Sequence, residues 1–333
     1  MDSGYKDSTV LITGGTGSIG LELTKAMLRH GIKQVRLFSN DENGLFEART
    51  LFSKDPRVVY KLGDVRDHGA VESAMVGCDI AFHAAALKHV NFCEENPYEA
   101  VSVNILGTQN VIDQSVKKGV ERFVFISTDK AVNPANTMGA TKLLGEKLTL
   151  DASKISNKGV FCCVRFGNVI GTRGSVVRIF EKQVKEGDSV TVKNEEMTRF
   201  IMLPSEASKL VLRAGERASS GDTFVLKMPA VRLGDLAKAS MEFFAALYGK
   251  DAKSMKIRRL VPNPEEKIHE ELMTSAEAGR AIKKDEFFII PYPKDSFASV
   301  QTTKKMRNCG YTSNSVPLLN VGEISSLLAR LYW

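Results

Sequence analysis

A glycine-rich turn directly follows the first apolar segment of this 333-residue chain, and no other feature constrains its fold as much. The segment Val10–Ile12 runs into Thr13–Gly20, where glycines 14, 17 and 20 have the spacing G-x-x-G-x-x-G. Such glycines allow a sharp turn, a close approach of pyrophosphate to the backbone, and tight packing of the next helix on the sheet. N–H groups at the start of that helix then face the phosphates. Because the turn joins an apolar strand to an amphipathic helix, it predicts a dinucleotide-binding βαβ unit.

Short β-branched or aromatic segments alternate with helical patterns through the first half of the chain. Strands that alternate with helices imply parallel βαβ units, so we expect an α/β fold with a doubly wound parallel sheet, the Rossmann fold. Helical patterns cover 21–30, 71–75 and 103–115. The expected strands are Val10–Ile12, Gln34–Phe38, Val58–Leu62, Asp79–Ala84, Arg122–Ile126 and Val160–Phe166.

The alternation weakens after about Gly167, which indicates a second and smaller part of the molecule. We expect residues 1–170 to form the dinucleotide-binding domain. Residues 171–333 are expected to form mainly a C-terminal substrate-binding lobe, with segments that cross back to the first domain. The pattern predicts helices at 175–187, 205–216, 231–247 and 321–331, strands at 189–192 and 223–226, and an irregular chain from Lys284.

Composition and charge exclude several classes of protein. Hydrophobic residues make up 43% and charged residues 26%, as in ordinary globular chains. No apolar run approaches the ~20 residues of a membrane span, and the polar N-terminus has no export segment, so we expect a cytoplasmic protein without a membrane partner. The net charge of +7 is scattered, which disfavours nucleic-acid binding. Five cysteines without a C-x-x-C pair indicate reduced thiols and no metal site.

Residues after the second and third strands are expected to contact the adenosine end of the dinucleotide. An acidic residue at the end of the second strand favours NAD, but this chain has Ser39 and Asn40 there. Such neutral side chains tolerate a 2′-phosphate, so the sequence favours NADP, with NAD as the alternative. Asp64 follows the third strand, where it either accepts a hydrogen bond from adenine or is merely a loop acid or a helix N-cap.

The chemically interesting residues follow the fifth strand. Asp129 and Lys130 end that strand, and ligands of doubly wound sheets bind at the carboxyl ends of the strands. Met138 and Lys142 follow with a spacing that puts them on one face of a helix. Lys142 could hold a nicotinamide ribose and lower neighbouring pKa values by its charge. A merely solvated Asp129–Lys130 ion pair is the alternative, which the upstream dinucleotide turn disfavours.

The sequence resembles the extended short-chain dehydrogenase/reductases that act on nucleotide sugars. Within that group it is most similar to the UDP-N-acetylglucosamine 4,6-dehydratases of surface-glycan and polysaccharide synthesis, over most of the chain. The glycine turn is widespread, whereas the segments around Lys88, Asp129 and Lys142 are far more specific. The matching segments are Thr13–Gly20, Gly63–Asp67, His83–Val90, Ser127–Pro134, Gly139–Lys142, Arg165–Val176, Met197–Phe200 and Glu266–Leu272.

The resemblance implies roles for the matching residues, and this superfamily commonly forms homo-oligomers. Arginines are the candidates for a diphosphate, because their planar donor fork matches paired oxygens. The expected cofactor-binding residues are Thr13, Gly14, Thr16, Gly17, Ser18, Ile19, Ser39, Asn40, Asp64, Val65, Ala84, Ala85, Lys142 and Val169. The expected UDP-sugar contacts are Lys88, Asn168, Arg173, Val177, Arg199, Arg258 and Glu266. The expected catalytic set is Thr128, Asp129, Lys130, Met138 and Lys142.

Three positions depart from the family pattern. Met138 replaces the usual tyrosine and cannot handle a proton, so this task passes to Thr128 or to the charged residues around it. Asn40 replaces a frequent arginine, which weakens the prediction of NADP. The segment Asn263–Lys267 lacks the arginine of the family's Arg-Pro-Gly-Glu-Lys, for which Arg258 or Arg259 could substitute.

The resemblance implies oxidation of the sugar at C4, elimination of water across C5 and C6, and return of hydride to C6. Lys130 is the expected base at C5 and Asp129 the expected acid on the 6-hydroxyl. We expect Lys88, Lys130 and Lys142 to cluster, because a neighbouring cation lowers the pKa of a lysine. The alternatives are a UDP-hexose 4-epimerase, which needs no acid at the 6-hydroxyl, and an NADP(H)-binding protein that has lost catalysis.

Overall fold

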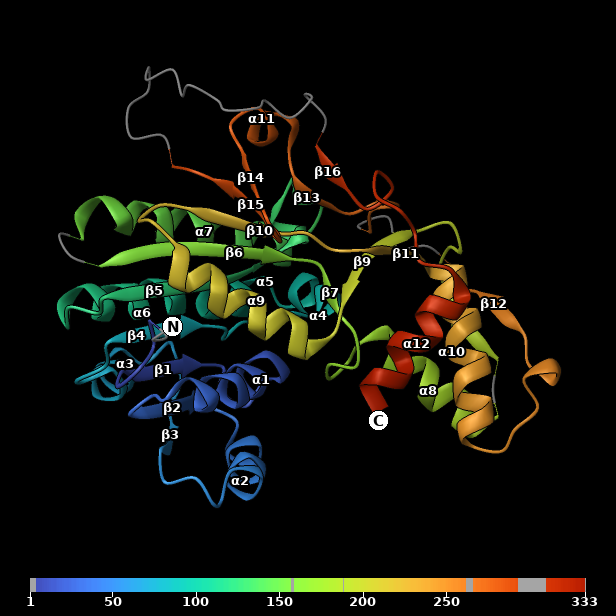
Figure 1. Ribbon diagram of the computed structural model, residues 1–333, viewed down its shortest axis with the longest axis horizontal. Coiled ribbons are helices and arrows are strands. Elements are labelled where there is room, and N and C mark those ends of the chain that lie inside the picture. Colours follow the sequence, from blue (N-terminus) through green and yellow to red (C-terminus); the bar gives the residue numbers. More distant parts are fainter. Residues whose placement is uncertain (1–3, 157–158, 188, 262–265, 293–309, 333) are drawn as a thin grey trace.

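A nine-stranded sheet forms the centre of the computed structural model, which describes residues 4–156, 159–187, 189–261, 266–292 and 310–332 (Figure 1). Six parallel strands lie in the order β6-β5-β4-β1-β2-β3, the order of a doubly wound dinucleotide fold. The predicted α/β fold class is therefore confirmed, and all six expected strands are present. They are β1 (Thr9–Thr13), β2 (Gln34–Ser39), β3 (Val58–Leu62), β4 (Ile80–His83), β5 (Arg122–Thr128) and β6 (Val160–Phe166).

Three strands from the second half of the chain extend this sheet beyond β6. Strand β10 (Thr223–Leu226) pairs in parallel with β6, and β15 (Phe287–Ile290) pairs antiparallel with β10. Strand β14 (Ile282–Lys284) then forms the edge of the sheet beside β15. The expectation of an irregular chain from Lys284 is wrong for β15, whose apolar residues are buried against the sheet.

Helices cover both faces of the sheet. On one face lie α1 (Ser18–Met27), α2 (Glu42–Leu51) and α9 (Pro204–Arg217), the last of which crosses the front of the sheet in Figure 1. On the other face lie α3 (His68–Met75), α6 (Gly107–Lys117) and α7 (Thr137–Ile155). Burial on both faces explains why the central strands consist almost entirely of apolar residues.

A smaller unit beside the sheet has its own hydrophobic core. Helices α8 (Val176–Glu186), α10 (Leu233–Leu247) and α12 (Val321–Tyr332) surround this core at the right of Figure 1. The helix expected at 231–247 begins only at Leu233, because Val231 and Arg232 pair with a neighbouring strand. The small sheets of this half contain β7 (Asn168–Val169), β8 (Val190–Val192), β9 (Thr198–Met202), β11 (Ala230–Arg232), β12 (Ile257–Arg259), β13 (Glu271–Met273) and β16 (Tyr311–Thr312).

Short elements connect the main ones. They are α4 (Val90–Glu95), α5 (Pro97–Val101), a π-helix (Ser102–Leu106), α11 (Ser275–Ala278) and the 3₁₀ helices η1 (Leu28–His30), η3 (Asp129–Ala131) and η4 (Ala252–Ser254). Among the described helices, none combines the length and the apolar composition that crossing a bilayer requires. The described part of the chain contains no cluster of three metal-ligating side chains. Cys78, Cys93, Cys162 and Cys163 are free and buried, and Cys309 lies outside the described residues.

A buried ion network joins the first half of the chain to the second half. Arg165 on β6 donates two hydrogen bonds of 2.7 Å to the carboxylate of Glu146 on α7. Its guanidinium also donates to Glu277 on α11, at 2.9 and 3.0 Å. The side chains of Arg165 and Glu146 are only 5% and 1% exposed, so each charge depends on the other for compensation.

Replacement of Arg165 by methionine is expected to lower the free energy of unfolding by about 3–5 kcal/mol, because it leaves Glu146 buried without a counter-charge. The double variant Arg165→Met/Glu146→Met should recover much of this loss. Urea denaturation followed by circular dichroism measures both values. Arg217→Met, which removes an exposed pair with Asp285, serves as the control and should change stability by about 0.5 kcal/mol or less. Equal effects of Arg165→Met and Arg217→Met would contradict the assignment.

Candidate active site

The glycine turn between β1 and α1 has the shape that a dinucleotide pyrophosphate requires. Gly14 has φ +64°, and a Cβ atom there would lie 2.7 Å from the backbone nitrogen of Ala85. A Cβ atom on Gly20 would lie 2.5 Å from the carbonyl oxygen of Gly14, so helix and turn pack without side chains between them. At Gly17, by contrast, the Gly14 carbonyl oxygen is the one atom of the described residues that such a Cβ would meet within 4 Å. The turn therefore leaves open space beside the N-terminus of α1, where an anionic phosphate is favoured.

Polar residues after β2 and β3 lie together at the expected adenosine end. The hydroxyl groups of Thr16 and Ser39 are 2.8 Å apart, and the Asn40 amide donates to Asp64 at 3.0 Å. Arg66 also donates to Asp64, and this hydrogen bond is the main reason why the pKa of Asp64 is lowered. The alternative reading of Asp64 as a helix cap is wrong, because Asp67 caps α3.

A buried histidine joins three elements beneath the site. The ring nitrogens of His83 lie 2.6 Å from the hydroxyl of Thr13 and 2.9 Å from that of Thr108. Burial, and secondarily the charge of Lys142, lowers the pKa of His83 to about 3, so the ring is neutral. The Thr13 hydroxyl also accepts from the backbone N–H of Ala85 at 3.3 Å. His83 lies within a recognised motif, yet no sequence signal distinguished its structural role.

The π-helix at Ser102–Leu106 directs Asn104 into the site, as π-bulges in functional regions often do. The Asn104 side chain accepts from the Leu87 N–H at 2.8 Å and donates to the Leu87 carbonyl at 2.9 Å. It also donates to the hydroxyl of Thr141 at 2.9 Å. This buried amide therefore fixes the loop that carries Lys88 against α7. Sequence reasoning missed Asn104, because a break in helix periodicity is not visible in the residue pattern.

Lys142 is buried on α7 at the carboxyl end of β5. Its ammonium donates to the Ile126 carbonyl at 2.5 Å and lies 4.1 Å from the centre of the Phe125 ring. Burial lowers the pKa of Lys142 to about 8, although the nearby Glu146 partly opposes this shift. Met138, one turn earlier, is buried in a small apolar cluster with residues of α4 and α5. Met138 therefore occupies an apolar position, and its thioether side chain can neither donate nor accept a proton there.

Asp129 and Lys130 form the 3₁₀ helix η3 directly after β5. One carboxylate oxygen of Asp129 accepts from the Thr128 hydroxyl at 2.8 Å and from the Lys130 ammonium at 2.9 Å. The other oxygen is buried and has no hydrogen-bond partner among the described residues. Helix α7 starts against this element, since a Cβ atom on Gly139 would lie 2.2 Å from the Lys130 carbonyl oxygen.

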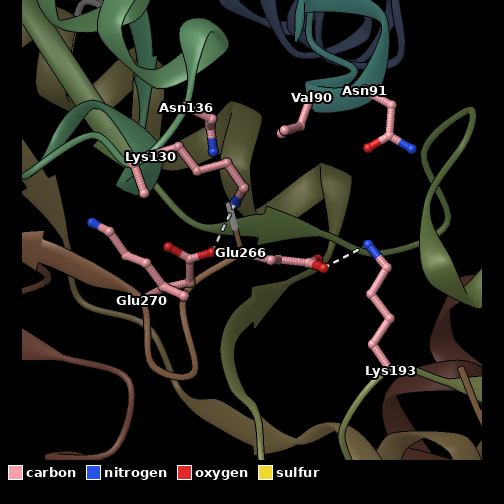
Figure 2. A pocket seen from close by; sticks show the side chains of 9 residues that line it. Val90, Asn91, Lys130, Asn136, Lys193, Glu266 and Glu270 are labelled. Carbon is pink, nitrogen blue, oxygen red and sulfur yellow. Dashed lines mark hydrogen bonds and ion pairs between the residues drawn. The ribbon is translucent and has the colours of Figure 1, made fainter. Parts of the chain in front are cut away.

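Glu270, which sequence reasoning missed, is the second carboxylate beside Lys130 (Figure 2). Its Oε1 lies 3.4 Å from the Lys130 ammonium and 3.7 Å from the Arg199 guanidinium. Burial alone lowers the pKa of Lys130, but Asp129 and Glu270 outweigh it and hold that pKa above its usual value. The expectation that cations lower the pKa of Lys130 is therefore wrong in its outcome, because the two carboxylates outweigh both burial and the charge of Arg199.

A small pocket opens in front of these charges, between the sheet and the second half of the chain. Within it, the Lys193 ammonium donates to Glu266 at 2.6 Å, and Lys267 donates to the Val132 carbonyl at 2.6 Å. Several cations beside hydrogen-bonding groups suit an anionic, hydroxylated ligand. The lining residues are Val90, Asn91, Lys130, Ala135, Asn136, Lys193, Glu266, Lys267 and Glu270 (Figure 2).

The other residues expected to contact the sugar nucleotide lie outside this lining. Val177 is fully buried in the core of the smaller unit and offers no surface to a ligand. Arg258 is exposed on β12, and Asn168 lies half-buried on β7. The Lys88 ammonium donates to the carbonyl of Arg173 at 2.6 Å. Lys130 and Lys142 donate to other groups, so the expected cluster of the three lysines is not formed. Residues 263–265 of the second-half motif lie outside the described residues.

Comparison with solved structures shows which known proteins share this fold. UDP-glucose 4-epimerase of Thermus thermophilus, in complex with NAD, has a TM-score of 0.66 at 22% identity and covers 78% of this chain and 88% of its own. DesIV, a dTDP-glucose 4,6-dehydratase from Streptomyces venezuelae with NAD and TYD bound, has a TM-score of 0.70 at 18% identity, with coverage of 78% and 86%. At such identities the likeness shows the fold.

Sequence comparison shows the family. Residues 10–292 match a family described as "Polysaccharide biosynthesis protein". UDP-glucose 4-epimerase of Rickettsia canadensis is 38% identical over 338 residues, and an uncharacterized membrane protein of Methanocaldococcus jannaschii is 42% identical over 330 residues, each with coverage of 98% and 97%. The X-ray structure of Pen from Bacillus thuringiensis has a TM-score of 0.91 at 40% identity, covering 98% of both chains. The chain belongs to this polysaccharide biosynthesis family, and its fold is that of the nucleotide-sugar dehydratase and epimerase structures above.

The lowered pKa of Lys142 predicts a pH-dependent term in stability. Its folded-state pKa of about 8 lies below the ~10.5 of an unfolded lysine, so the unfolded chain binds more protons in that interval. The free energy of unfolding of the wild type should therefore rise from about pH 8 to pH 10 relative to that of Lys142→Met. Urea denaturation of both proteins at these two pH values measures the difference. A difference that stays constant with pH would contradict the prediction.

Proposed function

We propose that this protein is a UDP-N-acetylglucosamine 4,6-dehydratase, which forms a UDP-4-keto-6-deoxy-N-acetylhexosamine for polysaccharide synthesis. The observation that carries the proposal is the ion pair, 2.9 Å long, between the buried Asp129 and Lys130, which lines the pocket. Epimerisation at C4 needs the groups that oxidise and reduce C4, but it needs no acid at the 6-hydroxyl. Elimination of water also needs a base for the C5 proton and an acid for the departing 6-hydroxyl. One oxygen of Asp129 has no hydrogen-bond partner among the described residues, and we propose Asp129 for that second task.

The glycine turn supports a nicotinamide dinucleotide as cofactor, and we propose NADP, with NAD as the alternative. When bound, the dinucleotide supplies the oxidant for C4 and the reductant for C6. Residues Thr16–Ile19 would hold the pyrophosphate, Ala84 and Ala85 would line the cofactor, and Lys142 would bind the nicotinamide ribose. The adenosine end would be bound by Ser39, Asn40, Asp64 and Val65.

One internal proton transfer would prepare both catalytic groups. The flanking carboxylates hold Lys130 as an ammonium, which cannot accept the proton that leaves C5 of the sugar. If its proton passes over 2.9 Å to Asp129, Lys130 becomes the amine base and Asp129 becomes the carboxylic acid. The amine then takes the C5 proton, and the acid protonates the departing 6-hydroxyl as water. Glu270 counter-charges the ammonium that results.

Lys130→Ala is expected to bind the dinucleotide and UDP-N-acetylglucosamine while its rate of product formation falls by about 10²–10⁴-fold, because the base is absent. Mass spectrometry of the product checks this, since the 4-keto-6-deoxy sugar nucleotide is one water lighter than the substrate. Lys117→Ala removes an exposed ion pair with Glu72 and is the matched control. Normal turnover by Lys130→Ala would remove Lys130 from the mechanism.

A second candidate function is UDP-glucose 4-epimerase, the name of the Rickettsia relatives at 38% identity. Incubation of the wild type with UDP-glucose and with UDP-N-acetylglucosamine separates the two functions. A dehydratase yields a lighter product, whereas an epimerase yields a product of unchanged mass with inverted C4. Dinucleotide binding without turnover of either sugar would instead indicate a protein that has lost catalysis.

We further propose that residues 171–333 contribute the main sugar-nucleotide contacts and that the protein is a homo-oligomer. Apolar side chains lie exposed on the adjacent helical segments α5, the π-helix and α7, and such surfaces commonly mark interfaces. Tyr98 is 77%, Leu106 55% and Ile155 66% exposed. Light scattering should therefore give a mass above that of one chain, and Leu106→Asp should lower it. A monomeric wild type would contradict this proposal.

A further inference from the structure

We infer that Arg173, on the segment Gly171–Ser175, binds the 2′-phosphate of NADP(H) and thereby sets the cofactor preference. This inference deepens the proposed function and rests on a nicotinamide dinucleotide binding at the glycine turn. It assigns Arg173 to the cofactor, whereas the sequence suggested the diphosphate of the sugar nucleotide.

The segment Gly171–Ser175 connects β7 to α8, contacts the start of α1, and is held on both sides. The backbone N–H of Arg173 donates to the Ser18 hydroxyl at 3.2 Å, and its carbonyl accepts from Lys88 at 2.6 Å. Gly174 has φ +73°, and a Cβ atom there would lie 2.5 Å from the ring of His89. These contacts fix the backbone of Arg173 beside the glycine turn. Its side chain can therefore reach the turn and the residues that follow β2.

The guanidinium of Arg173 lies at the adenosine end of the turn. Its Nη2 donates to the Thr16 carbonyl at 2.6 Å, and its Nη1 is 3.5 Å from the carboxylate of Asp41. The Thr16 side chain is itself bonded to Ser39, the last residue of β2. In a doubly wound fold, the ribose that carries the 2′-phosphate binds at the end of this strand. At 59% exposure, the side chain retains donors that can turn toward a ligand.

The charges around this position favour a phosphate over a free 2′-hydroxyl. NAD-specific sites place a carboxylate at the end of β2 to accept from that hydroxyl, but Ser39 and Asn40 stand there. Asp64 is engaged by Arg66 at 2.8 Å and by Asn40 at 3.0 Å. Arg173 therefore supplies, from the second half of the chain, the positive charge that position 40 lacks. Its planar fork matches two phosphate oxygens.

Asp41 is the competitor for this guanidinium. One oxygen of Asp41 caps α2 by accepting from the Gly44 N–H at 2.9 Å, while the other faces Arg173. A bound 2′-phosphate must take Arg173 from this carboxylate. Asp41→Asn removes the competing charge and retains the cap, since asparagine caps helices as well as aspartate does. Arg173→Gln and Asp41→Asn should therefore shift the cofactor preference in opposite directions.

Isothermal titration of the full chain with NADPH, NADH, 2′,5′-ADP and AMP tests the inference. The wild type should prefer NADPH to NADH and 2′,5′-ADP to AMP. Arg173→Gln should lose about 10- to 100-fold in affinity for the two 2′-phosphorylated ligands, as expected for charged hydrogen bonds, and keep its affinity for the other two. Asp41→Asn should gain affinity for NADPH. Lys182→Gln, which loses an exposed charge on α8, is the matched control and should resemble the wild type.

Three results would overturn the inference. These are a wild type that prefers NADH, an unchanged NADPH affinity in Arg173→Gln, and an equal loss for phosphorylated and unphosphorylated ligands, which would place Arg173 at the pyrophosphate. Retained AMP binding shows that a variant is folded. Failure of the proposed function has a separate signature, because the wild type would then bind dinucleotide but release no dehydrated product from UDP-N-acetylglucosamine.

Discussion

Alternating charges, three of them buried and the fourth on the partly exposed Lys130, join the two halves of the molecule at the pocket. Asp129 and Lys130 come from the end of β5, whereas Glu270 and Arg199 come from the second half of the chain. Taking any of these charges out of water is costly unless a partner of opposite sign accompanies it. Each half contributes one acid and one base, and the contact between Lys130 and Glu270 joins the two pairs, so the protonation state of Lys130 depends on the position of the second half.

The central sheet could be predicted from the sequence because its signals are local. Each of the six strands is a short apolar run, and the glycine turn has a spacing that only close backbone packing explains. The strand β15 gave no such signal, since its pairing with β10 joins segments far apart in the chain. The start of α10 was misplaced for a similar reason, because pairing with β9 overrides the helical pattern at Val231.

The position of Asp129 and Lys130 at the end of β5 could be predicted from the sequence, but the electrostatics around them could not. The residues beside Lys130 in the chain include a single acid, and the other lysines of the motifs suggested a cluster of cations. The fold instead brings Glu270 to 3.4 Å from its ammonium, which reverses the expected direction of the pKa shift. His83 and Asn104 are similar cases, because their roles arise from partners on other elements rather than from their own neighbours in sequence.

The contacts of Arg173 connect cofactor binding to the rest of the site. Its carbonyl is held by Lys88, from the loop after β4, and its segment leads directly into α8 of the smaller unit. A ligand that repositions this residue therefore acts on both the loop and the helix. Coupling between two binding sites is reciprocal, so a sugar nucleotide that stabilises the same arrangement must also strengthen dinucleotide binding. Such coupling suits a reaction in which oxidation and reduction occur on one bound sugar, because the dinucleotide has to stay in place between the two steps.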